Sequence, residues 1–527
     1  MKNIPRSLLG FKLIAALAMA SAGVTSLQAQ ILRSYTGADT TNWSSTGSWA
    51  GAVVPLTNDD VSFRNSATGT NTFNLAIGFT IRNLGVASRT LDSNAAANNV
   101  TTTLDLNSRT LNATNLTVGE TNGTGSLTGN FTVGSGTLNL AGGSIQVGVR
   151  SSNNSIGATG TVTGTSSLNF NATGMTSLRV GVGTGQNGGA TGTMDFTNIN
   201  QGNLSVVGGG DTVYIGARLG ALTGTVSTGT VILGTNWDST AFGTSGNRAG
   251  VYVGSRLVNN AGNGTFTQSG GTFTAHSTNF FVGSSSNTTE STALNGTVNL
   301  SGTSSALIDA TDLWVGSSGL TTAVVTGSLT LGSGGQIVAG TTVVGRSGSS
   351  SLTTQASLAL DKASLTVVGA TGTLLINNRG QVDATVGLTA GGINRGGLII
   401  ENTAASALTI NSLTTDSRGL QFTFENFNTS LWEVGNAGNF EAIYYAIRWQ
   451  GINRTAALNT LITDLKLSAD TSAISGSPTA QVFFQGGDTY YGFYVNSIPE
   501  PSTYAMVALG LGALYLLRRK KNSGKPS

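Results

Sequence analysis

A glycine-containing triplet, Gly-Thr or Gly-Ser followed by an apolar residue, recurs through most of this chain at a nearly constant spacing. It begins at Gly125, Gly160, Gly192, Gly224, Gly264, Gly296, Gly327 and Gly372. Four of the seven gaps fall within one residue of 32. A fixed period of this length is typical of stacked arrays, in which each unit covers the apolar face of its neighbour.

A second marker, an aliphatic residue followed by glycine, keeps phase with the triplets. It stands at Val118-Gly119, Val147-Gly148, Val180-Gly181, Ile215-Gly216, Val253-Gly254, Val282-Gly283 and Val315-Gly316. Each unit therefore reads as a strand, a glycine stop, a variable polar loop, a Gly-Thr start and two further strands. We expect Val162, Met194 and Val226, which follow the Gly-Thr pairs, to occupy equivalent inward positions.

Between the glycines, apolar residues recur at every second position, as in Leu116/Val118 and Leu138/Leu140. This alternation is typical of strands, and glycine supplies the positive φ that tight corners demand. The sequence predicts an all-β, elongated parallel β-solenoid over residues 100–419, with Asn and Thr side chains forming ladders between rungs. A row of antiparallel hairpins or several small sandwiches would show the same local pattern.

The segment before the repeats, 30–99, is expected to form an N-terminal entry or cap. Trp43 and Trp49 would share one face of an unbroken strand and cover the open end of the first rung. Asp59 and Asp60 are adjacent, so on a strand they point to opposite faces and make a poor calcium site. This W-rich, acidic entry to a Gly/Thr/Asn-rich body is similar to autotransporter-associated β-strand repeat proteins, which implies a β-helix.

Aromatic residues concentrate near the end of the body. Of the 35 in the chain, 14 lie between Gln421 and Val495, which predicts a small aromatic-rich cap domain over 420–497. Within it, the apolar spacing of Ala456 to Lys466 predicts a short helix with Thr455 as its N-cap. The aromatics could pack as a core, or they could form a platform on which sugar rings stack.

Side-chain chemistry limits the enzyme classes open to this chain. It has no cysteine and one histidine, His276, interpreted as an exposed strand residue, so no transition-metal site and no cofactor is expected. The nearest acidic pair in the repeats, Asp309 and Asp312, is expected to face opposite sides of a strand. The segment at Gly208 resembles a calcium-binding nonapeptide, but it is not tandem. We therefore expect no catalytic residues.

The chain begins like an exported protein. Lys2, Arg6 and Lys12 precede the apolar segment Leu13–Val24, which is the layout of a signal peptide over residues 1–29. Three of the 26 basic residues lie there and five lie in the last 30 residues, which leaves 18 against 22 acidic residues in the body. The body therefore carries about −4, and its basic residues are scattered. Nucleic-acid binding is not expected.

The last 30 residues, 498–527, contain three signals in order: Pro499-Glu500-Pro501, an apolar run of 14 residues and a basic cluster. The cluster is Arg518, Arg519, Lys520 and Lys521. A 14-residue helix spans only about 21 Å, less than the ~30 Å hydrocarbon core of a bilayer. A short hydrophobic helix with a transient stay in the inner membrane is expected, and an ordinary membrane anchor is the alternative.

This tail resembles the PEP-CTERM sorting signal of Gram-negative bacteria. The resemblance implies processing by an exosortase-type enzyme at the inner membrane and delivery to the cell surface or an exopolysaccharide matrix. It makes Pro499, Glu500, Pro501 and the basic cluster the sorting motif. We expect a non-catalytic surface, matrix or adhesin-like repeat protein, with exopolysaccharide as a possible partner. The alternative is a polysaccharide-active β-helix enzyme, either a lyase or a glycosidase, or a carbohydrate-binding protein.

Overall fold

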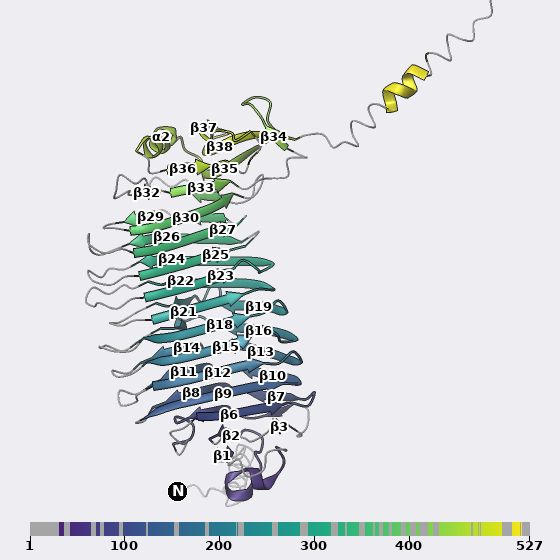
Figure 1. The fold of residues 1–527 in the computed structure, drawn as a ribbon, viewed down its shortest axis with the longest axis vertical. Coiled ribbons are helices and arrows are strands. Elements are labelled where there is room, and N and C mark those ends of the chain that lie inside the picture. Colours follow the sequence, from purple (N-terminus) through teal and green to yellow (C-terminus); the bar gives the residue numbers. More distant parts are fainter. Residues whose placement is uncertain are drawn as a thin grey trace, which may run out of the picture.

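The computed structural model describes most of the body of the chain. The described residues are 31–35, 43–64, 70–73, 78–93, 99–122, 125–151, 157–184, 189–217, 219, 226–255, 262–284, 294–317, 325–332, 335–346, 354–361, 364–367, 373–378, 382–390, 397–400, 407–410, 420–424, 432–464, 467–472, 474, 476–497, 509–516 and 518. They form a tall stack of short parallel strands with a compact cap at its C-terminal end (Figure 1). The predicted all-β parallel solenoid is confirmed.

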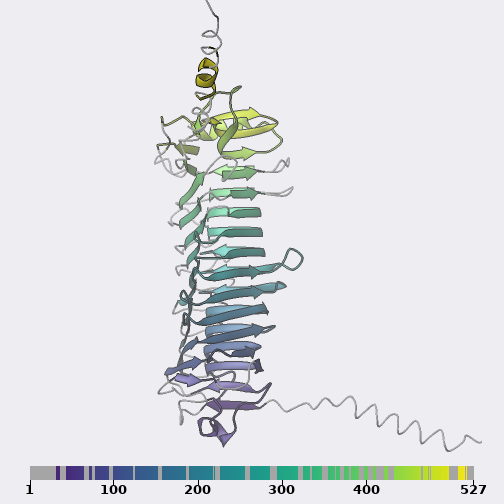
Figure 2. The ribbon, with the colours of Figure 1, turned by 90° about the vertical axis from the view of Figure 1, so that its right-hand side faces the viewer.

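Each turn of the stack contributes one strand to each of three parallel columns. The first column is a separate sheet of 13 strands: β3 (Thr70–Thr72), β6 (Asn99–Asp105), β9 (Ser126–Gly134), β12 (Gly157–Gly164), β15 (Ala190–Phe196), β18 (Ser227–Leu233), β21 (Gly262–Gln268), β23 (Leu294–Leu300), β25 (Val325–Leu331), β27 (Thr354–Asp361), β30 (Val382–Ala390), β33 (Leu420–Phe424) and β36 (Leu467–Asp470). Figure 2 shows these rungs nearly edge-on.

The other two columns lie in one larger sheet. The second column contains β4 (Phe79–Thr80), β7 (Thr110–Ala113), β10 (Gly136–Ala141), β13 (Leu168–Met175), β16 (Gln201–Val206), β19 (Trp237–Phe242), β28 (Ser364–Val367) and β31 (Gly397–Ile400). The third contains β1 (Leu32–Tyr35), β2 (Asp60–Phe63), β5 (Asn83–Ser88), β8 (Asn115–Thr121), β11 (Ser144–Arg150), β14 (Ser177–Gly183), β17 (Gly210–Ile215), β20 (Ala249–Val253), β29 (Thr373–Asn378) and β32 (Ala407–Ile410). In three rungs one long strand serves both columns: β22 (Thr272–Val282), β24 (Ser305–Ser317) and β26 (Gln336–Arg346).

The register of the first column corrects part of the repeat assignment. Val162 pairs with Met194 as predicted, and both are fully buried, but Met194 pairs with Val231 and not with Val226. Val226 is 41% exposed. The triplet glycine of this rung is accordingly Gly229. A Gly-Thr-apolar triplet also fits the polar loops of such a sequence, so the pattern alone did not separate strand from loop.

The same kind of error affects two other triplets. Gly129, and not Gly125, pairs with Gly160 in the first column. The partner of Gly327 one rung on is Ala356, whereas Gly372 lies outside the described residues. The remaining triplet glycines stack in register as predicted: Gly160, Gly192, Gly264, Gly296 and Gly327.

The second marker is in register throughout. Its aliphatic residues pair from Val118 to Val315 along the third column, and its seven glycines all have φ between +55° and +63°. These glycines also lie directly against the first column. A Cβ on Gly181 would lie 1.8 Å from the carbonyl oxygen of Thr228, and one on Gly192 would lie 2.2 Å from the nitrogen of Gly181. The two markers therefore lie where the backbones of the first and third columns touch each other across a narrow interior.

The triplet glycine thus has a different role from the one predicted. Gly160 and Gly192 lie inside β12 and β15, not at strand starts, and neither has positive φ. Glycine is needed there because the approaching backbone leaves no space for a side chain. In the third column, glycine is needed both for that reason and for its left-handed conformation.

Asparagine ladders join the rungs on the outside, as predicted. Asn139 donates to Asn112 over 2.9 Å, Asn171 donates to Asn139 over 3.1 Å, and Asn203 donates to Asn171 over 3.1 Å. Ser239 continues the line by donating to Asn203 over 2.9 Å. Each side-chain amide both donates and accepts, so one residue type repeated at one position satisfies itself from rung to rung.

Aromatic residues close the N-terminal end. Trp43 and Trp49 are buried, 5.1 Å apart between ring centroids, and pack with Tyr35, Phe63 and Phe73. The predicted cap is present, but the strand between the tryptophans is not. The chain instead makes the 3-10 turns η1 (Thr46–Ser48) and η2 (Ala50–Ala52), and the Trp49 indole donates to the Trp43 carbonyl over 2.8 Å. Parallel stacking also begins earlier than residue 100, because β1 and β2 pair in the third column.

The C-terminal cap adds an antiparallel sheet to the stack. It contains β34 (Trp432–Val434), β35 (Ala442–Trp449), β37 (Gln481–Gln485) and β38 (Asp488–Ser497), and β35 joins the stack by pairing with β31. The helix α2 (Thr455–Thr463) packs on it through Leu458. The predicted N-cap is wrong: Arg454 precedes the helix and Thr455 is its first residue. The side chain of Asn453 accepts the Thr455 amide hydrogen over 3.1 Å.

Candidate functional site

The aromatic residues of the cap divide into two sets by strand parity. In β38, Tyr491, Phe493 and Val495 point into the core and are buried. Tyr490, Gly492 and Tyr494 alternate with them on the outer face, where the pairing of Phe483 with Tyr490 places the Phe483 side chain as well. The aromatic residues of β38 therefore divide into a buried set on one face of the sheet and an outer set on the other.

The outer aromatics form a continuous, half-buried row. The ring centroids of Phe440 and Tyr494 lie 4.7 Å apart, those of Tyr494 and Phe483 lie 4.4 Å apart, and those of Phe483 and Tyr490 lie 5.5 Å apart. The last two pairs are stacked, with interplanar angles of 29° and 21°. Burial raises the pKa of Tyr494, so its phenol stays neutral across the physiological range.

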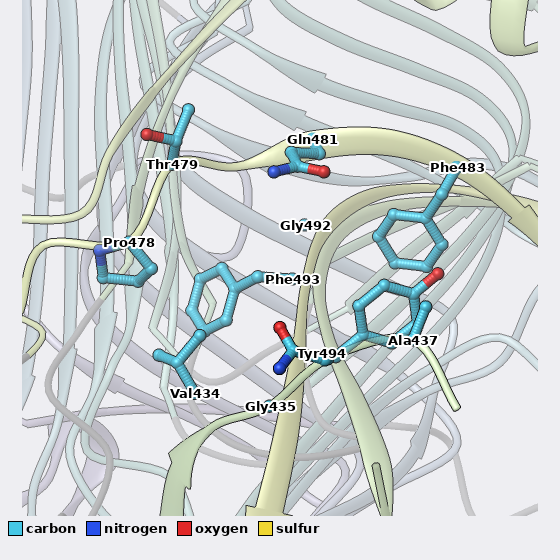
Figure 3. Close-up of a pocket in the computed structure, with 11 residues that line it drawn as sticks. Val434, Gly435, Ala437, Pro478, Thr479, Gln481, Phe483, Gly492, Phe493 and Tyr494 are labelled. Carbon is cyan, nitrogen blue, oxygen red and sulfur yellow. The ribbon is translucent and has the colours of Figure 1, made fainter. Parts of the chain in front are cut away.

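A groove opens beside this row because two strands share one edge of β38. On that edge β37 pairs as far as Gly492, while β34 pairs only from Val495. Between them the chain leaves a groove of about 390 Å³ (Figure 3). Its lining residues are Val434, Gly435, Asn436, Ala437, Pro478, Thr479, Gln481, Phe483, Gly492, Phe493 and Tyr494.

The described residues that line the groove are uncharged, and several of them are polar. Gln481 projects from one wall and Thr479 and Pro478 stand beside it, opposite Val434 and Gly435, while Phe483 and Tyr494 lie together at one end (Figure 3). Within the described part of the chain, the side-chain amides of Asn436 and Gln481 have no hydrogen-bond partner. A charged pair lies nearby outside the lining: Arg448 Nε is 2.7 Å from Asp488 Oδ2.

The acidic residues near the N-terminus are held in structural pairs. Asp59 binds Arg33 at 2.9 Å, and Asp60 binds Arg82 and accepts from Asn83 at 2.8 Å. The two carboxylates therefore point to different partners, as expected. A second groove, of about 350 Å³, passes Asp60 and Arg82, whose opposite charges are already paired.

His276 belongs to an ionic cluster with Asp309 and Arg248. Its Nδ1 lies 2.8 Å from Asp309, and Arg248 donates to both oxygens of the same carboxylate at 2.9 Å. Arg248 also donates to the carbonyl groups of Ser277 and Asp309, so it fastens its own loop to the next two rungs. The histidine is on a strand as predicted, but it is only partly exposed. Asp309 and Asp312 both face outward, because β24 turns a corner between them.

A second apolar cluster, which the sequence did not reveal, lies outside the main core. It contains Val149, Val182, Tyr214, Ala217, Tyr252 and Phe281. Tyr214 and Tyr252 stack at 5.2 Å, and Tyr252 donates to Asp211 over 2.6 Å. Burial, reinforced by Asp211, raises the pKa of Tyr252 far above its ordinary value. These rings occupy outward positions of successive rungs yet are buried, so they act as packing.

The described residues include only part of the predicted sorting motif. Arg518 lies in the structure, just beyond a short helix at 509–516 whose leucine side chains are exposed, whereas Pro499, Glu500, Pro501, Arg519, Lys520 and Lys521 lie outside the described residues. None of the helices in the described part of the chain has the length and apolar character that crossing a bilayer would require. Among the described residues there is also no group of three potential metal ligands.

One comparison with known proteins identifies this tail. Residues 497–521 match the family model of the PEP-CTERM protein-sorting motif. The chain is therefore an exported protein that carries a β-solenoid body and is recognised by an exosortase-type enzyme at the membrane. No curated protein and no solved structure matches the chain.

Proposed function

We propose that this protein is a non-catalytic structural component of the cell surface or extracellular matrix. In this role the solenoid acts as a spacer between the sorted C-terminus and the N-terminal end. The observation that carries the proposal is the position of the motif, which begins at residue 497, where β38 ends. The whole folded body is thereby presented as one unit to the sorting machinery.

The use of charge in the body supports a structural role. Four acids of the body bind basic or hydroxyl partners: Asp59 with Arg33, Asp60 with Arg82, Asp309 with Arg248, and Glu120 with Ser88 and Ser151. Despite burial, hydrogen bonds from His276 and Arg248 lower the pKa of Asp309, which makes this carboxylate a weak general base and a poor proton donor. Release of shortened or unsaturated fragments from any polysaccharide by the purified chain would contradict this proposal.

The test of sorting is replacement of Pro499, Glu500 and Pro501 by alanine in the native host. We expect the variant to be exported but retained at full length in the inner membrane, while the wild type is trimmed and reaches the surface or matrix. Mass spectrometry of each cell fraction measures both properties. Alanines at Lys525, Pro526 and Ser527, which lie beyond the matched motif, serve as the control. Normal trimming of the first variant would refute the role of the tripeptide.

A further inference from the structure

We propose that the groove between β34 and β37, together with Phe440, Phe483 and Tyr494, binds a neutral polysaccharide. This inference deepens the proposed surface or matrix role and rests on it for its biological setting. The aromatic row and the groove are continuous, because Phe483 and Tyr494 belong to both. A ligand could therefore place one sugar ring against the aromatic row and its neighbour in the groove.

The aromatic row offers a pyranose ring an apolar surface formed by the exposed edges of stacked rings. The edge of an aromatic ring is weakly positive, so it can lie against the ring oxygen and hydroxyl oxygens of a sugar. Phe483 and Tyr494 lie nearly parallel, at 29°, with part of each ring exposed. The arrangement is fixed by antiparallel pairing on β38, so no conformational change is needed to form it.

The groove supplies hydrogen-bonding groups of the type that sugars use. A side-chain amide presents donors and an acceptor in one plane, which matches neighbouring hydroxyl groups. Asn436 and Gln481 stand on two sides of the groove, and neither amide is engaged by another described residue. Thr479 adds a hydroxyl group. A volume of about 390 Å³ is within the usual range of small-molecule sites.

Charge and backbone pairing select against other ligands. Among the described residues that line the groove none is charged, so none of them would neutralise an acidic sugar or a phosphate. An added peptide strand would need a free edge, but β37 and β34 already pair with this edge of β38. The Gly435 amide also donates to the Tyr494 carbonyl over 2.9 Å. A neutral glycan meets neither obstacle.

The test is binding of the purified full-length chain to soluble neutral glucans, galactans and mannans, with alginate and polygalacturonate as acidic comparisons. Isothermal titration calorimetry and affinity electrophoresis give the affinities. We expect Tyr494→Ala to weaken binding of the preferred neutral glycan by about tenfold or more, which corresponds to the loss of one well-formed contact. Phe484→Ala is the matched control: it removes a 45% exposed aromatic ring from the same strand pair but from the other face, and should leave affinity unchanged.

Gln481→Ala guards against a folding artefact, because it shortens a partly solvent-exposed side chain. It should weaken binding severalfold while the thermal unfolding curve stays that of the wild type. Absence of binding to every neutral glycan, preference for the acidic ones, or equal losses in Tyr494→Ala and Phe484→Ala would each overturn the inference. These measurements use purified protein, so their failure is distinct from a failure of sorting in the host.

Discussion

At the scale of single residues, the fold depends on two columns of glycine that touch. The sequence revealed both columns, because glycine repeats in phase with the strands. It could not reveal why the triplet glycines are needed, since a missing side chain looks the same in a turn and in a close approach of two backbones. Only the register places Gly192 against Gly181.

This contact can be separated from backbone conformation by two substitutions. Gly181→Ala puts a methyl group at φ +63°, within 1.8 Å of a carbonyl oxygen, whereas Gly142→Ala puts one at φ +74° with nothing within 4 Å. The left-handed conformation alone costs about 1–2 kcal/mol. We expect Gly142→Ala to lower the free energy of unfolding by that amount and Gly181→Ala to lower it clearly more, as measured by chemical denaturation. Equal losses of stability in the two variants would show that the contact between Gly181 and the first column is unimportant.

Ala87 shows how far this position tolerates a side chain. It occupies the marker position in β5, next to Val86, and adopts φ +50°. It lies one rung closer to the N-terminal cap than Gly119, the first of the seven marker glycines. A rung near the end of the stack has fewer neighbouring rungs, which fits the presence of a methyl group at this position.

The ionic cluster at His276 predicts a pH dependence of stability. Burial of Asp309 favours its neutral form, but hydrogen bonds from His276 and Arg248 outweigh this and hold its pKa below the ordinary 3.8. A carboxylate with a lowered pKa stabilises the fold above its unfolded-state pKa, and this contribution is lost as the pH falls through the folded-state value. Because the pair is partly exposed, the contribution is about 1 kcal/mol or less.

Asp309→Asn should therefore lower the free energy of unfolding at neutral pH, and this deficit should disappear as the pH falls below the folded-state pKa of Asp309. Urea denaturation at a series of pH values measures the effect. Asp312→Asn provides the control, because Asp312 forms no ion pair with any described residue. A deficit in Asp309→Asn that is independent of pH would contradict the assigned role of the charge.

At the scale of elements, the period of the sequence predicted the strands better than their register. Strands, inward apolar positions and asparagine ladders follow from alternation and repetition, which are local properties. Loops between the third and first columns vary in length, so the start of each rung is not fixed by counting. This is why Val226 was assigned to the core in place of Val231. In the cap, strand parity separated two aromatic faces that composition alone could not distinguish.

The two valines provide a direct test of the register. Val231→Lys places a cation in a narrow apolar core, at a cost of several kcal/mol, whereas Val226→Lys changes an exposed residue and should stay within about 0.5 kcal/mol of the wild type. Circular dichroism during thermal unfolding compares them. A larger loss of stability for Val226→Lys than for Val231→Lys would contradict this register and support the inward position that the sequence predicted for Val226.

At the scale of the whole molecule, the stack is a rod whose length is set by its number of rungs. Thirteen strands in the first column at about 4.8 Å each give roughly 60 Å. Deletion of residues 160–191 joins Thr159 to Gly192, and because Thr159 and Thr191 are equivalent, it removes one whole rung. β10 and β11 would then face β16 and β17 in place of β13 and β14. We expect a folded protein shorter by about 5 Å in small-angle scattering. Deletion of 160–175 removes about half a rung and should not fold.

The way in which the tail leaves the cap has a mechanical consequence. The tail follows Ser497, the last residue of β38, and β38 is hydrogen-bonded to β35 along one edge and to β37 and β34 along the other. Tension applied through the tail would act along this strand, so both rows of hydrogen bonds would resist it together in shear and would not open one at a time. The cap is thus the strong point of the rod, at the end where a pull on the tail would arrive.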